Sequence, residues 1–190
     1  MNEYLLLVVG WIVYFTLHSV LATDSVKSKF PPRVFRIFYV LFSTAGLLAL
    51  LFYNASIPSL KFFVSEGPLR YISLMLTTFG VMTIQSSFRQ YSFKGFIGFG
   101  DETKELRKDG VLKYVRHPIL AGLILIVLGF FFFIPNLPTL ISCVCVLIYV
   151  PIGIYFEEKK LVAIYGDAYV EYQKKVPAIF PKAISHGSRG

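Results

Sequence analysis

Five long runs of apolar residues constrain the fold of this chain more than any other feature of its sequence. The runs cover residues 4–22, 34–53, 69–88, 119–134 and 137–156. A bilayer has a hydrocarbon core about 30 Å thick, which a helix of about 20 residues can cross. The sequence therefore predicts five membrane spans, of which the fourth is short.

The backbone of each run determines its secondary structure. Lipid offers no partner for an unpaired N–H or C=O group, so a spanning segment has to be a helix or part of a closed barrel. The chain lacks the short segments of alternating hydrophobicity that are typical of barrels. We therefore expect an all-α integral membrane protein with five transmembrane helices. The composition agrees, because 55% of the residues are hydrophobic and the mean hydropathy is +0.64.

The first apolar run has the position of a secretory signal but not its pattern. Glu3 stands where a signal carries basic residues, and Thr16, His18 and Ser19 interrupt the apolar core. We expect this run to remain in the protein as a helix. The His18-Ser19 pair near its end indicates packing or helix capping more than chemistry.

The lysines and arginines are distributed unequally between the two predicted sides of the membrane. Of the 19 basic residues, Lys61 and Arg70 lie on one side, and the others lie in the loops and tail of the other side. Cytosolic loops carry an excess of such residues, so we expect the N-terminus outside and the C-terminus in the cytosol. The net charge of +8 then indicates anionic lipid headgroups as partners and no nucleic acid.

No residue pattern indicates a metal site. The sequence has three isolated histidines and no CxxC motif. Cys143 and Cys145 are two positions apart in the fifth run, where we interpret them as packing residues.

The chain divides into two parts within a single domain. Residues 1–88 hold three spans with short links, which predicts a transmembrane scaffold. Residues 89–190 hold a cytosolic loop, a helical hairpin and a charged tail, together with nearly all candidate functional groups. The loop begins with aromatic residues interleaved with Gly95, Gly98 and Gly100, and we expect this stretch to lie in the membrane interface.

The last two spans predict a helical hairpin with its turn at residues 135–138. Similar lengths of chain lead back from this turn to His117 and forward to Glu157, so both ends return to the same face of the membrane. Arg116, His117, Glu157 and Glu158 should therefore converge at the cytosolic interface.

This expected cluster has two interpretations. Pro118 suits the first turn of a helix, where its missing N–H costs nothing, and it places His117 at the positive end of that helix. Arg116, His117 and the free helix amides would suit an anionic ligand, and the glutamates would suit hydroxyl or amine groups. Alternatively, these charged residues only anchor helix ends at the headgroups.

The tail predicts an extension of the fifth helix as far as Gly166, followed by a second, short amphipathic helix that ends near Pro177. Tyr169 and Tyr172 either lie at headgroup depth or form the wall of a pocket over the mouth of the hairpin. Residues 185–190 have the composition of a disordered end.

A series of motifs runs through residues 89–181. In order, these are Gly110-Val111-Leu112-Lys113-Tyr114-Val115-Arg116-His117-Pro118, Gly122, Glu157-Glu158, Tyr165-Gly166-Asp167-Ala168-Tyr169-Val170-Glu171-Tyr172, Val176-Pro177 and Pro181. The series resembles the integral membrane methyltransferases, which include isoprenylcysteine carboxyl methyltransferase and the phospholipid N-methyltransferases. The chain departs from the family pattern at Leu120, where RHPxYxG has a tyrosine, and at Leu112, where the family has an aromatic residue.

The resemblance implies methyl transfer from S-adenosylmethionine, held in the cytosolic mouth of the last two spans and covered by the C-terminal segment. It implies that Arg116 and Glu158 are catalytic. The residues that it implies for cofactor binding are His117, Pro118, Leu120, Gly122, Glu157, Tyr169 and Tyr172. The acceptor arrives from the bilayer or is small. A prenylcysteine-like carboxylate, a lipid amine and a thiol remain open, as does the oligomeric state.

Two other classes of membrane protein share parts of this pattern. Membrane sterol reductases, which use NADPH, are similar around His117-Pro118 and in the tail, but they usually have Asn-Tyr after His-Pro and lack the glutamate pair. Non-catalytic proteins of the NnrU type keep the architecture, and the short chain and Leu120 are compatible with them. A glutamate pair that faces His117 favours the methyltransferase.

Overall fold

The computed structural model describes residues 2–88 and 106–181, and within these ranges the chain is mainly helical. The helices are α1 (Glu3–Leu21), α2 (Asp24–Lys27), α3 (Pro32–Ser56), α4 (Gly67–Phe88), the 3₁₀ helix η1 (Gly110–Lys113), α6 (Pro118–Phe133), α7 (Leu137–Tyr165) and α8 (Asp167–Lys175). Lys61 and Asn136 form an isolated antiparallel bridge. The all-α prediction is confirmed. The predictions for residues 95–100 and 185–190 lie outside the described residues.

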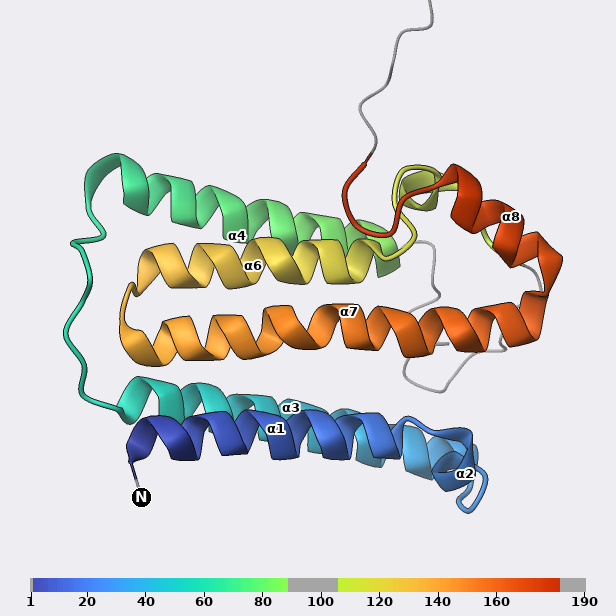
Figure 1. Cartoon of the computed structure of the whole chain (residues 1–190), viewed down its shortest axis with the longest axis horizontal. Helices are drawn as coiled ribbons and strands as arrows, with labels where there is room; N and C mark the ends of the chain where they lie inside the picture. The colour runs from blue at the N-terminus through green and yellow to red at the C-terminus, as the bar shows by residue number, and fades with distance from the viewer. Residues whose placement is uncertain (1, 89–105, 182–190) are drawn as a thin grey trace, which may run out of the picture.

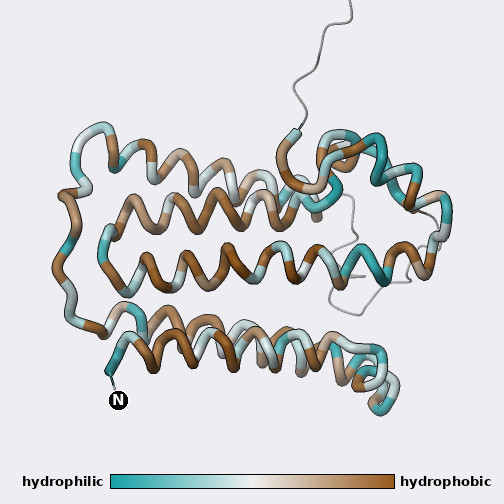
Figure 2. Tube along the Cα trace, in the orientation of Figure 1, coloured by the Kyte–Doolittle hydropathy of each residue, from teal (hydrophilic) through white to brown (hydrophobic). Residues whose placement is uncertain are grey.

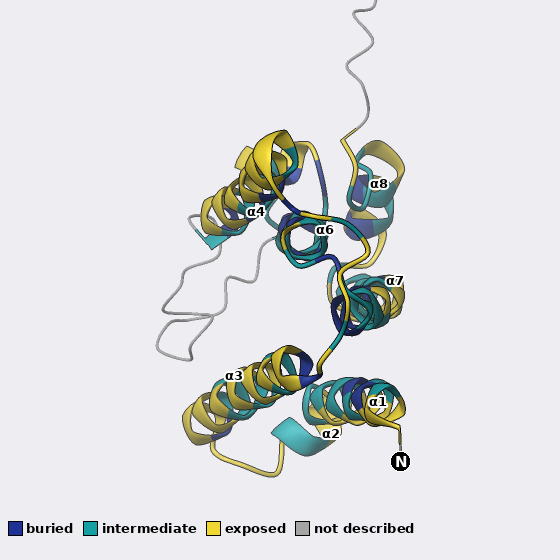
Figure 3. Cartoon of the chain, turned by 90° about the vertical axis from the view of Figure 1, so that its left-hand side faces the viewer, coloured by how far each residue is buried: buried dark blue, intermediate teal, exposed yellow. Residues whose placement is uncertain are grey.

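The long helices lie side by side, with α7 between the α4–α6 pair and the α1–α3 pair (Figures 1 and 3). Three of them, α1, α3 and α7, are long and apolar enough to cross a membrane. Apolar side chains cover much of the outside: Phe52 is 78% exposed and Leu41 is 64% exposed, as suits a surface in contact with lipid. These features agree with an integral membrane protein.

The count of five spans stays a prediction. Helix α6 is apolar but has 16 residues, which at 1.5 Å per residue cover about 24 Å, less than a typical hydrocarbon core. Helix α4 has 22 residues, but its sequence includes Arg70 and several hydroxyl side chains.

The N-terminal helices are joined to α7 by buried polar contacts. Trp11 Nε1 donates a hydrogen bond to Ser142 Oγ at 2.9 Å, and this hydroxyl donates to Asn54 Oδ1 at 2.9 Å. The three residues come from α1, α7 and α3, and all are buried. Because lipid offers no replacement partners, these bonds hold the three helices in a fixed register.

A second polar group joins the same helices closer to the end of α1. The two ring nitrogens of His18 lie 3.0 Å from Ser43 Oγ and 2.9 Å from the Tyr39 hydroxyl, both on α3. The Ser19 hydroxyl lies 2.8 Å from that of Tyr149 on α7. Contacts between helices therefore explain the presence of His18 and Ser19 in this apolar segment.

Helix α4 packs mainly against α6, and glycines allow the close approach. A Cβ atom added at Gly80 would lie 2.5 Å from the carbonyl oxygen of Gly122, and one added at Gly122 would lie 2.6 Å from the carbonyl oxygen of Gly80. Small residues of this kind let helix backbones touch in membranes. The third apolar run is therefore in contact with the C-terminal part of the chain, while the proposed boundary at residue 88 stays a prediction.

Local signals begin and end α7, and after its end the chain turns back toward the hairpin. Asn136 caps the start of α7 by accepting a hydrogen bond from the N–H of Thr139 at 3.0 Å. The helix continues to Tyr165, where Gly166 takes a positive φ of 55° and turns the chain into α8. The predicted break at Gly166 is confirmed. Figure 2 shows that the first part of α7 is mainly hydrophobic and that a hydrophilic stretch interrupts its second part before a short hydrophobic end.

Candidate active site

Arg116 and Glu158 meet where α6 begins and α7 leaves its apolar part. Nε and Nη2 of Arg116 each lie 2.7 Å from Oε1 of Glu158. The side chains are 11% and 16% exposed, so the pair is largely shielded from solvent. The structure thus brings together residues that the hairpin prediction had placed at one face.

Arg116 also holds the C-terminal segment. Its Nη1 donates to the carbonyl oxygen of Gln173 at 3.0 Å and to the carbonyl oxygen of Val176. The backbone N–H groups of Arg116 and His117 donate to the carbonyls of residues 177–178 at 2.9 Å each. The segment after α8 therefore runs beside the start of α6 and is fixed to it.

His117 lies between the two glutamates. Its Nε2 is 3.0 Å from Oε1 of Glu158, and its Nδ1 is 3.2 Å from Oε2 of Glu157. Burial by itself would lower the pKa of His117, but the hydrogen bonds and negative charges of the two carboxylates outweigh it. The net result is a pKa raised above the ordinary value for histidine.

The two glutamates differ in whether a carboxylate oxygen remains available for a ligand. Both oxygens of Glu158 are engaged, because Gln173 Nε2 donates to Oε2 at 2.8 Å while Arg116 and His117 share Oε1. Glu157 is 55% exposed and contacts His117 through one oxygen. Glu157 is thus the carboxylate of the pair that faces outward.

Tyr169 and Tyr172 attach α8 to the segment before α6. They are 2% and 5% exposed, and their rings lie edge to face with centroids 5.8 Å apart. The Tyr172 hydroxyl donates to the carbonyl oxygen of Leu112 in η1 at 2.6 Å. Burial raises the pKa of Tyr169, so its hydroxyl stays protonated. This burial does not fit rings exposed at headgroup depth, and a role of the two rings as a pocket wall stays a prediction.

The remaining predicted cofactor residues lie on the first turns of α6. Pro118 is at the first helical position, as expected, and Leu120 is half-buried. The space that was expected to admit a ligand at Gly122 is occupied by Gly80 and Ile84 of α4. Helix packing accounts for Gly122, and we leave it out of the proposed cofactor site.

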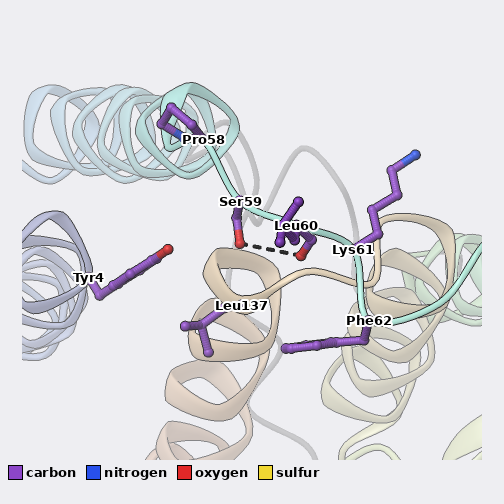
Figure 4. A pocket seen from close by; sticks show the side chains of 7 residues that line it. All are labelled: Tyr4, Pro58, Ser59, Leu60, Lys61, Phe62 and Leu137. Carbon is purple, nitrogen blue, oxygen red and sulfur yellow. Dashed lines mark hydrogen bonds between the residues drawn. The ribbon is translucent and has the colours of Figure 1, made fainter.

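A separate pocket lies at the opposite end of the helices, where α1 and α7 begin (Figure 4). It has a volume of about 690 Å³ and is lined by Tyr4, Pro58, Ser59, Leu60, Lys61, Phe62 and Leu137. None of the predicted site residues lines it. The pocket lies at the other end of the helices from Arg116, and Lys61 is the one charged residue in its lining. We therefore do not assign it to the candidate active site.

Gln173 and the tail backbone contribute to the site without having been predicted from the sequence. Gln173 follows Tyr172 in the tail motif, but nothing in the spacing links it to Glu158, 15 residues earlier. The carbonyls that bind Arg116 leave no side-chain signal at all. The sole sequence indication was the Val176-Pro177 end of α8, which marks where the chain becomes extended.

Comparison with known proteins identifies the family. Residues 69–168 match the phospholipid methyltransferase family. A methanethiol S-methyltransferase from Crocosphaera subtropica is 30% identical, over 93% of this chain and 74% of the relative. Methanethiol S-methyltransferase 1 from Bradyrhizobium diazoefficiens is 28% identical, over 86% of this chain and 62% of the relative. A protein-S-isoprenylcysteine O-methyltransferase from Schizosaccharomyces pombe is 36% identical, over 38% of this chain and 31% of the relative.

The apolar helical fold, together with these matches, defines the class of protein as a membrane methyltransferase. Within that class, the chain belongs to the phospholipid methyltransferase family. The resemblance that the motifs around Arg116 and Glu158 indicated is confirmed.

Proposed function

We propose that this chain transfers a methyl group from S-adenosylmethionine to a small thiol, at the cytosolic interface of a membrane that it crosses several times. The observation that carries the proposal is the cluster of Arg116, His117, Glu157 and Glu158, which the tail closes from one side. Family membership supplies the reaction class. In this proposal, the cluster binds the charged and hydroxyl groups of the nucleoside cofactor.

The groups around the cluster fit such a cofactor. The outward oxygen of Glu157 suits ribose hydroxyls or an ammonium group, because an ionised carboxylate accepts hydrogen bonds from both. The start of α6 offers the positive end of a helix to a carboxylate. Arg116 and Glu158 are largely consumed by each other and by the tail. We therefore assign them the role of holding the site together, in place of the catalytic role that the resemblance implied.

The main task of the protein in this reaction is to align the acceptor with the methyl donor. When bound, the cofactor supplies an activated methyl group on a sulfonium. An acceptor sulfur would take up this methyl group in exchange for the thiol proton, which would pass to solvent, and the demethylated donor would leave. The protein has to hold the acceptor in line and keep competing water away from the methyl group. The buried rings of Tyr169 and Tyr172 and the docked tail contribute to that shielding.

The extent of the matches supports a small thiol as the acceptor. The relatives named for methanethiol match 93% and 86% of this chain, so both matches have to include α3. The relative named for prenylcysteine matches 38% of this chain. Helix α3 is tied to α7 through Asn54 and Ser142, so the similarity covers part of the helical body that supports the site.

The proposed side of the membrane follows from charge. The cluster lies at the end of the molecule that also holds α2 and α8 (Figure 1). This end carries Lys27, Lys160, Lys174 and Lys175, whereas the connection between α3 and α4 carries Lys61. An excess of basic residues marks the cytosolic side.

Ligand-induced stabilisation tests the cofactor. In detergent, S-adenosylhomocysteine at 100 times its dissociation constant should raise the free energy of unfolding by about 2.7 kcal/mol, and NADPH should not change it. Glu157→Gln should weaken the stabilisation. The matched control is Glu66→Gln, a change to an exposed carboxylate near the start of α4, which should leave it intact. Stabilisation by NADPH alone would favour a reductase, and stabilisation by neither compound would favour a non-catalytic protein.

A further inference from the structure

His117 contacts two consecutive glutamates of α7, one with each ring nitrogen. Successive side chains on a helix point about 100° apart, so Glu157 and Glu158 leave α7 in different directions. One carboxylate turns inward to Arg116 and Gln173, and the other turns outward. The ring of His117 reaches both, with one nitrogen on each.

This arrangement determines the protonation state of the ring. An ionised carboxylate can only accept hydrogen bonds, and a neutral imidazole has a single N–H to donate. A neutral ring would leave one nitrogen lone pair facing a carboxylate oxygen at 3.0 or 3.2 Å. Both contacts are favourable only if both nitrogens carry protons.

The other charged and titratable groups around the ring are compatible with this state. Helix α7 contributes the two carboxylates that face the ring. The neighbouring residue Arg116 contributes a cation, which shares Oε1 of Glu158 with the ring. From α8, the buried Tyr169 brings a neutral hydroxyl to the same cluster. The two negative charges thus balance two positive charges, and His117 at 4% exposure has no access to water as an alternative partner.

We infer that His117 is a positioning residue, held as an imidazolium ion that bridges the two glutamates and fixes the outward carboxylate of Glu157 for ligand binding. The ligand part of this inference rests on the proposed function: Glu157 would receive the ribose hydroxyls or the ammonium group of the methyl donor. The bridge itself rests on the geometry alone. His117 acts through Glu157 and does not touch the cofactor, in contrast to the binding role that the resemblance implied.

The bridge makes the site sensitive to pH in one direction. When His117 loses a proton at high pH, one of its two contacts becomes unfavourable. Glu158 keeps Arg116 and Gln173, whereas Glu157 has no other partner among its described contacts. The ring should therefore release Glu157, and affinity for the donor should fall while the tail stays docked.

Nitrogen NMR of histidine tests the bridge without any ligand. The full chain, labelled with ¹⁵N-histidine in detergent, has three histidine rings, and His117→Gln assigns the signal of interest. We expect both nitrogens of His117 to be protonated at pH 7, with a titration midpoint above the ordinary value of about 6.5. A ring with one protonated nitrogen at pH 7 would overturn the inference, whatever the enzyme does.

Two substitutions then separate the two contacts. The amide nitrogen of asparagine can take the place of Nδ1, and that of glutamine can take the place of Nε2. His117→Asn should keep the contact with Glu157, and His117→Gln should keep the contact with Glu158. Binding of S-adenosylhomocysteine, measured by calorimetry from pH 6 to pH 9, should weaken about tenfold with rising pH in the wild type and stay constant in both variants.

The comparison between the variants decides the positioning role. At pH 6, His117→Asn should bind S-adenosylhomocysteine more tightly than His117→Gln, because it preserves the orientation of Glu157. Equal affinities in the wild type and both variants would overturn the role. If the NMR spectrum shows a doubly protonated ring but the wild type binds no S-adenosylhomocysteine, the bridge stands and the proposed function fails.

Discussion

Arg116 and Glu158 are 42 positions apart in the chain, yet their side chains form an ion pair with two contacts of 2.7 Å. The pair connects the start of α6 with α7, and Arg116 extends the connection to the carbonyls that follow α8. Three segments of the C-terminal part are therefore held by one guanidinium group.

Glu158→Gln should destabilise the protein and release the tail. The substitution leaves the cation of Arg116 shielded from water without a counter-charge, which costs about 2 kcal/mol for a charged hydrogen bond in a partly buried site. Thermal unfolding in detergent and limited proteolysis after α8 would measure the two effects. The control is Glu171→Gln, which removes an exposed pair with Lys174 and should cost less than about 1 kcal/mol. Equal effects of the two changes would contradict the account of the tail.

The stability of the protein should fall as the pH rises past neutrality, because the pKa of His117 is raised in the folded state. The stabilisation is complete below the unfolded pKa of about 6.5 and is lost as the pH rises through the folded pKa. Unfolding would be followed from pH 5.5 to pH 9 in the wild type and in His117→Asn. The difference between the two curves should shrink with rising pH. A difference that stays constant would show that His117 is not protonated in the folded protein.

Gly80→Val should separate α4 from α6. Its Cβ would lie 2.5 Å from the carbonyl oxygen of Gly122, so the backbones have to move apart, at a cost of about 1–3 kcal/mol or more. The matched control is Gly153→Ala on α7, where the nearest atom to the new Cβ is 3.9 Å away and no loss is expected. Equal melting temperatures for Gly80→Val and the wild type would contradict the close packing.

Ser142→Ala should weaken the attachment of α1 and α3 to α7. The change leaves Trp11 Nε1 without its acceptor and Asn54 Oδ1 without its donor, at a cost of about 1–3 kcal/mol for buried polar groups. Ser56→Ala, which removes an exposed bond to the carbonyl of Tyr53, serves as the control. Thermal unfolding of both variants would decide, and a larger loss in Ser56→Ala would rule out the described network.

The sequence predicted much of the helical architecture because lipid permits few alternatives. The hairpin turn, predicted at residues 135–138 and found at residues 134–136, and the break at Gly166 followed from proline, asparagine and glycine, whose backbone preferences are local. The meeting of Arg116 with Glu158 followed from the equal lengths of the two hairpin arms. Each of these inferences needed only helix geometry.

Contacts made through backbone atoms could not be predicted in the same way. The carbonyls of Gln173 and Val176 bind Arg116, but carbonyls are identical at every position of a sequence. Gly122 was expected to bind the cofactor, because a glycine indicates that something approaches the backbone closely. The sequence does not show what approaches, and in the structure it is Gly80. The bridge made by His117 depends on the different directions in which Glu157 and Glu158 point. These directions depend on how α7 is rotated about its own axis, which the sequence does not give.

Transfer of a labelled methyl group tests the central claim most directly. The purified protein would receive S-adenosylmethionine carrying a labelled methyl group, with methanethiol, a prenylcysteine and a phospholipid amine offered in parallel. We predict a labelled methyl thioether from methanethiol, a reduced rate with Glu157→Gln and an unchanged rate with Glu66→Gln. Absence of a labelled thioether, or the appearance of label in the prenylcysteine or phospholipid instead, would contradict the proposed function.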